Sequence, residues 1–204
     1  MSDIWPIVHA ERVALIDDLA ELADDLWERP SLCGGWTVHD VAAHLINNAK
    51  ATRLGIVRDM VRARFDFARM TAQGVERERG ATPRETLARL RKVATLTSTP
   101  PAPLDSRLVE EVVHGEDIRR PLGIKREYSA EAVVRSLRYQ AHTPVSLGGA
   151  KQLVSAVRLC ATDEAVFIGD GPEISGPALS LLLAISGRKV ALSDLTGPGL
   201  RVLD

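Results

Sequence analysis

The chain has 204 residues, a length that suits one domain, or one domain with a small appendage. Hydrophobic residues make up 45% of it and aromatic residues only 4%, so its core must come mainly from Leu, Val, Ile and Ala, a composition that favours packed helices over disorder. The net charge of −1 gives no global reason to expect a nucleic-acid or membrane-surface partner, and no apolar stretch approaches the ~20 residues of a membrane-spanning helix.

The N-terminus and the cysteines indicate a reducing compartment. The stretch "MSDIWPIVHAERV" carries acidic residues and lacks the basic-then-apolar layout of a secretion signal. Cys33 and Cys160 lie far apart in the sequence and form no disulfide framework. We therefore expect a cytoplasmic protein with two free thiols.

The first half of the chain predicts two long helices. The first spans residues 4–27, where apolar residues recur on one stripe: Ile4, Val8, Leu15, Leu19, Leu22 and Leu26. Pro30 ends it, and "PSLCGGW" predicts a loop. Thr37 is a candidate N-cap, with Asp40 three residues on, and it opens a second helix that extends to about residue 72.

The second half predicts three more helices, followed by a region of short strands and one short helix. The helices cover about 83–97, 104–120 and 129–142. After residue 145, "LVSAVRLCATD", "AVFIGD" and "GLRVL" have the short apolar runs of strands, and "GPALSLLLAISG" predicts a short helix. We expect an α+β protein with a helical bundle domain over 1–145 and a small α+β domain over 146–204.

A metal site is predicted from three polar residues in two apolar helix segments. Glu110 and His114, in "EEVVHGED", are four residues apart and point from one helical face. His44, in "HDVAAHL", would complete a set of two imidazoles and one carboxylate. Three such ligands with an open position suit a catalytic zinc, and also a ferrous ion. Glu111 is an alternative carboxylate.

Ordinary structural roles compete with this prediction. A lone histidine on the inner face of a helix is more often a hydrogen-bonded core residue, and a Glu–His pair at this spacing is usually a surface pair. Against that, a buried Glu110 would need a partner. His39 is about 140° around the helix from His44, so the two cannot share an ion, and we expect His39 to be an exposed first-turn residue.

Two segments, "SLCGGWTVHDVAAHL" and "VEEVVHGEDIRRPLG", closely resemble the mycothiol-dependent maleylpyruvate isomerase family, part of the DinB-like superfamily of four-helix metal-binding proteins. The resemblance implies an up-down four-helix bundle followed by a small sterol-carrier-like unit. It also implies that His44, Glu110 and His114 hold a divalent metal, usually zinc. The family's C-terminal domain contributes a catalytic arginine, which Arg188 in "LLLAISGRKV" matches best.

The resemblance further implies a function, in which a zinc-bound thiolate of mycothiol adds to an electrophilic small molecule. Isomerisation or thiol S-transfer would follow. The alternative is a non-catalytic metal-binding bundle that binds a ligand or a partner. Asp40 is either a helix cap or a hydrogen-bond acceptor that orients His44. Trp36 either packs the loop onto the bundle or lines the substrate site. The sequence names neither the substrate nor the oligomeric state.

Overall fold

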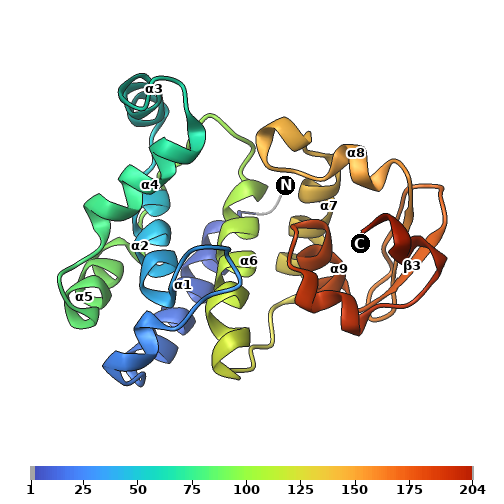
Figure 1. Cartoon of the computed structure of the whole chain (residues 1–204), viewed down its shortest axis with the longest axis horizontal. Coiled ribbons are helices and arrows are strands. Elements are labelled where there is room, and N and C mark those ends of the chain that lie inside the picture. The colour runs from blue at the N-terminus through green and yellow to red at the C-terminus, as the bar shows by residue number, and fades with distance from the viewer. Residues whose placement is uncertain (1–2, 204) are drawn as a thin grey trace. The chain divides into compact units, whose positions relative to one another are not determined.

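The computed structural model describes residues 3–203, which form two compact units (Figure 1). One unit ends at Arg126 and the other begins at Glu127. Helix α7 (Ala130–His142), which the sequence assigns to the bundle, packs against α9 (Ala178–Ile185) in the C-terminal unit. Among the described residues, no helix is both long and apolar enough to cross a membrane.

The N-terminal unit is a helical bundle with two additional helices. Helices α1, α2, α5 and α6 pack around one core, while α4 lies against α2 and α3 against α4 (Figure 1). The elements are α1 (Trp5–Ala20), the 3₁₀ turn η1 (Asp24–Glu28), α2 (Val38–Ala49), α3 (Arg53–Arg62), α4 (Phe67–Glu78), α5 (Pro83–Val93) and α6 (Asp105–Leu122). This architecture confirms the expected helical bundle.

The core of this unit is aliphatic, as the composition predicts. It is built from residues that are nearly or fully buried on the inner faces of the four helices, among them Leu15, Leu19, Val41, Leu45, Ile46, Leu90 and Ile118. Trp27 in η1 closes one part of the core and is 1% exposed. Because α2 presents its apolar residues to this core, its remaining face is left to carry His44.

The single helix predicted over 37–72 is wrong, since the chain forms α2, α3 and α4 there. The side chains of Thr52 and Asp66 accept hydrogen bonds from the backbone N–H groups of Gly55 and Arg69, and so begin α3 and α4. Between these two helices, Arg64 and Phe65 adopt left-handed backbone angles, with φ of 58° and 63°. A continuous helix cannot pass through such residues.

Other helix boundaries differ less. Helix α1 ends at Ala20, before the predicted end at residue 27, because the chain turns into η1. Helix α6 runs through Pro121 to Leu122 and ends at Gly123, whose φ of 72° is the left-handed conformation common after a helix. The helix predicted over 129–142 is confirmed as α7.

The C-terminal unit contains a three-stranded sheet. After α7 come η2 (Val145–Leu147), α8 (Lys151–Val154), β1 (Arg158–Ala161), β2 (Phe167–Ile168), β3 (Glu173–Gly176), α9, η3 (Lys189–Asp194) and η4 (Pro198–Val202). The strand order is β2-β1-β3, with β1 antiparallel to β2 and parallel to β3. Helix α9 packs on β1 and β3, and the result confirms the expected α+β character.

Two expectations for this unit are wrong in detail. The "GLRVL" stretch is the 3₁₀ helix η4 and not a last strand, because Gly197, with φ of 113°, turns the chain into Pro198. The first part of "LVSAVRLCATD" belongs to α8, and only its second part forms β1. Strand β3, which has no clear sequence signal, pairs along its whole length with β1.

Candidate metal centre

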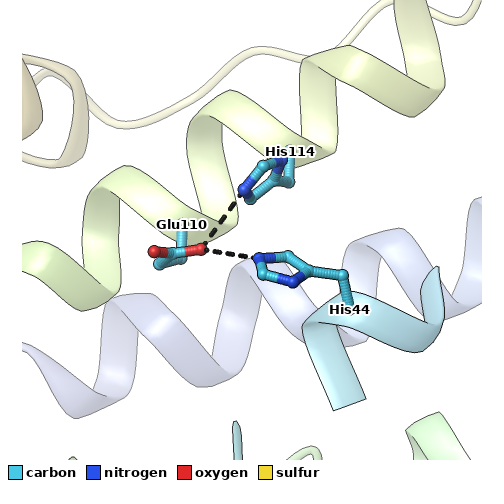
Figure 2. A group of neighbouring side chains, drawn as sticks. All are labelled: His44, Glu110 and His114. Atoms are coloured by element: carbon cyan, nitrogen blue, oxygen red, sulfur yellow. Dashed lines mark hydrogen bonds and ion pairs between the residues drawn. The ribbon is translucent and has the colours of Figure 1, made fainter. Parts of the chain in front are cut away.

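His44, Glu110 and His114 converge from two helices, as Figure 2 shows: His44 from α2, and the other two from successive turns of α6. The start of α2 is fixed by a capping box. The Thr37 hydroxyl accepts from the Asp40 backbone N–H at 3.2 Å, and Asp40 Oδ2 accepts from the Thr37 N–H at 3.0 Å. His44 therefore lies nearly two turns after a well-defined helix start.

The three side chains are spaced as ligands of one ion would be. Glu110 Oε2 lies 3.4 Å from His44 Nε2 and 3.3 Å from His114 Nε2, and all the ligand atoms lie within 4.8 Å of one another. A strong hydrogen bond of this type spans roughly 2.7–3.2 Å. Atoms that bind a tetrahedral zinc at about 2.0–2.2 Å lie about 3.3–3.6 Å apart. The two distances from Glu110 Oε2 are therefore long for hydrogen bonds and fall in the range for two ligands of one divalent cation.

Two of the three groups, Glu110 and His44, are in a charge state that suits a cation. Burial alone would raise the pKa of Glu110, but contact with His114 and His44 outweighs it and holds that pKa well below its usual range. Burial lowers the pKa of His44, more than its contact with Glu110 raises it. At neutral pH the cluster thus offers an ionised carboxylate and a neutral imidazole at His44, which are the forms that bind metal.

His114 is held by a second carboxylate. Its Nδ1 lies 2.9 Å from Oδ2 of Asp117, one turn further along α6 and fully buried. Burial alone would lower the pKa of His114, yet Asp117 and Glu110 together raise it to about 9. A carboxylate on Nδ1 leaves Nε2 facing Glu110, and this carboxylate–histidine arrangement is usual for metal-binding histidines. The sequence signal that could have revealed Asp117 is its i+3 spacing from His114.

Trp36 borders the cluster on one side. Its ring centroid lies 5.2 Å from that of His44, at an interplanar angle of 51°. It also packs against the bundle core, which confirms its predicted role in fixing the loop. The same side chain lines an open cleft of about 760 Å³, whose wall includes Asp40, Val75 and Arg79. The N-terminal unit thus places a cleft of small-molecule size next to an aromatic wall of the cluster.

Two predictions about neighbouring residues are resolved by contacts. The prediction that His39 is exposed is wrong: it is 2% exposed, and its ring contacts Thr86 Oγ1 at 2.6 Å and Glu28 Oε1 at 3.1 Å. The alternative carboxylate Glu111 bonds to Arg12 Nε at 2.7 Å and so faces away from His44.

Asp40 caps α2 and does not orient His44. Its second oxygen lies 3.5 Å from Arg79 Nε, while Nδ1 of His44 is buried without a hydrogen-bond partner. The capping interpretation of Asp40 is thus confirmed, and its predicted role as an acceptor for His44 is wrong.

Arg188 and the two cysteines are not among the three grouped residues. Arg188 belongs to the C-terminal unit, where it follows α9 and its Nη1 donates to the Ser186 carbonyl at 2.5 Å. Cys33 and Cys160 form no disulfide, as predicted, and burial raises the pKa of the Cys160 thiol. Neither cysteine joins the three grouped residues.

Comparison with known proteins gives one family and one fold. Residues 8–105 match the model of the mycothiol maleylpyruvate isomerase N-terminal domain, a stretch that includes His44 and ends before Glu110. A crystal structure of the mycothiol-dependent maleylpyruvate isomerase has 16% sequence identity and a TM-score of 0.63, and that of a histidine-to-alanine mutant has 14% and 0.65. Each comparison covers 95% of this chain and 91% of the other. No curated protein sequence matches the chain.

Proposed function

We propose that this protein is a metal- and mycothiol-dependent enzyme, because residues 8–105 match the model of the mycothiol maleylpyruvate isomerase N-terminal domain. Its substrate would be an electrophilic small molecule. The observation that carries the proposal is the convergence of His44, Glu110 and His114, with Glu110 Oε2 3.4 Å and 3.3 Å from the two imidazole nitrogens. Glu110 and His114 lie beyond the matched residues, so the geometry supports the metal centre independently of the family match.

The donor set suits zinc. Two imidazoles and one carboxylate leave an open coordination position, which is the arrangement of catalytic rather than structural zinc sites. A divalent ion bound there would lower the pKa of a coordinated thiol and so supply a thiolate at neutral pH. Asp117 would keep Nε2 of His114 directed at the ion, and Trp36 would restrict water on the side of His44.

Two outcomes are open to a thiol that adds to an electrophilic double bond. The sulfur forms a bond to one carbon of the double bond. The electron pair of that double bond moves onto the electron-withdrawing group that makes the substrate electrophilic. Loss of the sulfur after rotation about the former double bond regenerates the thiol and gives the other isomer. Uptake of a proton in place of that loss gives an S-conjugate. The proposal covers both an isomerase and a thiol S-transferase.

The cleft beside Trp36 is the proposed place for the non-reacting part of a bound molecule. The cleft is lined by the Trp36 ring, which contacts His44, and by the polar side chains of Asp40 and Arg79. Arg188 stays a prediction for the catalytic arginine, on the strength of the sequence resemblance alone. The cytoplasmic location also stays a prediction, which two cysteines without a disulfide support.

The first test is metal content. Wild-type protein should carry about one divalent ion per chain, and His44→Ala and Glu110→Ala should each lose it. His142→Ala is the matched control, because this exposed histidine bonds to the carbonyl of Arg138 within its own helix and is not among the grouped residues. Equal metal content in wild type and both ligand variants would contradict the metal centre.

The second test is thiol chemistry. Metal-loaded wild type should consume mycothiol or isomerise a substrate across a panel of electrophiles with cis or trans double bonds, and His44→Ala should not. Full metal loading without turnover on a wide panel would instead favour the alternative, a metal-binding bundle that binds a ligand or partner without catalysis.

A further inference from the structure

Arg107 is a buried cation one turn before Glu110 on α6. Its side chain is 3% exposed. Its Nη1 donates to Asn48 twice, at 2.6 Å to Oδ1 and at 3.2 Å to the backbone carbonyl, while its Nε is buried without a hydrogen-bond partner. The other buried arginines of this unit, Arg12 and Arg119, bond to carboxylates. Arg107 differs because its hydrogen bonds go to an uncharged amide and a backbone carbonyl, while the Glu111 carboxylate interacts with it only through its charge.

The contact between Arg107 and Asn48 lies next to the metal centre on both helices. Asn48 follows His44 by one turn of α2, and Arg107 precedes Glu110 by nearly one turn of α6. Asn48 therefore faces Arg107 just as His44 faces Glu110, which shows that α2 and α6 run antiparallel here. One helical turn rises about 5.4 Å, so this contact is the next layer of side chains between the two helices.

The chemistry of this contact favours positioning over stability. Burial removes the guanidinium from water, which costs free energy. Hydrogen bonds to an amide offset less of this desolvation cost than bonds to a carboxylate would. A neutral, apolar side chain of similar size would avoid the penalty. What Arg107 does supply is a two-point bond to Asn48, near the end of α2, where the helix dipole favours a cation. Such a bond fixes how far α2 can slide or tilt against α6.

We propose that Arg107 is a positioning residue of the metal centre. Through Asn48 it sets the register of α2 against α6, and hence the separation of His44 Nε2 from Glu110 Oε2. A ligand set split between two helices needs such a device, because functional geometry must hold to within about 0.5 Å. The inference rests on the metal centre proposed above, and it concerns residues that do not themselves contact the ion.

The experiment uses Co²⁺ as the probe, with the full chain. Three quantities are measured: Co²⁺ affinity, the visible absorption spectrum of bound Co²⁺, and the unfolding midpoint of the metal-free protein. Arg107→Gln should lower Co²⁺ affinity about tenfold and change the spectrum, as loss of supporting residues does at other metal sites. Arg107→Lys should recover part of both, because an ammonium group still donates to Asn48. Asn48→Ala should resemble Arg107→Gln, and the double variant should be no worse than either.

The matched control is Arg12→Met combined with Glu111→Leu. It replaces a buried pair that forms no hydrogen bond to Asn48 or to the proposed ligands, so it should shift the unfolding midpoint without changing the Co²⁺ spectrum. Wild-type affinity and spectrum in Arg107→Gln would overturn the positioning role while leaving the metal centre intact, as would a loss that merely follows the unfolding midpoint. If wild type itself binds no Co²⁺, the metal centre and this role are both overturned. Should Arg107→Gln fail to fold, Arg107→Lys and Asn48→Ala decide the question.

Discussion

His114 and Asp117 form a pair in which the buried carboxylate lies 2.9 Å from Nδ1, so the opposite ring nitrogen is left facing Glu110. We expect Asp117→Asn, which keeps the size but removes the charge, to lower zinc affinity about 10- to 100-fold. Competition with a chromophoric chelator measures this. Glu116→Gln is the control, since that carboxylate lies on the same helix but bonds to Arg120. Equal losses in the two variants would show that the effect is not specific to His114.

Metal affinity should rise with pH up to about 9. His114 has a raised pKa of about 9 in the metal-free protein, so an ion must displace a proton from it at neutral pH. Below that pKa the affinity should fall about tenfold per pH unit, and chelator titrations at three pH values measure the slope. A flat profile would mean that His114 is not a ligand.

The same raised pKa has the opposite effect on the metal-free fold. A group whose pKa is higher in the folded state stabilises that state fully below its unfolded value, about 6.5, and this stability is lost as pH rises through about 9. Urea unfolding of metal-free protein should therefore show a falling free energy of unfolding between these two pH values. In His114→Gln this part of the pH dependence should disappear.

Trp36→Ala should weaken substrate binding more than it affects metal content. The ring contributes stacking and burial worth roughly 1 kcal/mol, so KM should rise about fivefold. Metal quantification and steady-state kinetics on the same preparation separate the two effects. A variant that loses the metal itself would show that Trp36 supports His44 rather than the bound molecule. Trp5→Ala, distant in sequence and packed on His9, is the control.

Arg12 and Glu111 form a buried pair whose disruption should cost stability. Arg12→Met leaves Glu111 buried and uncompensated, so the free energy of unfolding should fall by about 3–5 kcal/mol. Burial already raises the pKa of Glu111, more than Arg12 lowers it. Adding Glu111→Leu should restore much of the loss, and urea titration measures both. The backbone carbonyls of Val93 and Leu96, which Arg12 also bonds, limit the recovery.

The proximity of the three proposed ligands could be predicted because much of it is local. Glu110 and His114 share a helical face at their four-residue spacing, whatever the rest of the fold does. The choice between Glu110 and Glu111 could not be settled, since both spacings from His114 are compatible with one face. The distant partner Arg12 on α1 decides it by drawing Glu111 to the other side.

The errors come from contacts that span long stretches of chain. His39 is a polar residue in a first turn, where exposure is the usual outcome, and its burial is explained by contacts with Thr86, Glu28 and the Trp27 ring. The helix breaks near Thr52 and Asp66 are hidden because apolar residues continue at helical spacing across them. Strand β3 is four residues long, and it is defined by its pairing with β1 rather than by its own pattern.

His44 and Glu110 are separated by 66 positions in the chain, yet they meet at one point. An ion held between them would therefore act as a cross-link that closes a long loop, much as a disulfide does. Closure of such a loop removes unfolded-state entropy worth several kcal/mol by the usual chain-entropy estimate. Amide hydrogen exchange in α3 to α5, which lie inside that loop, should then slow on metal loading even though none of these helices supplies a ligand.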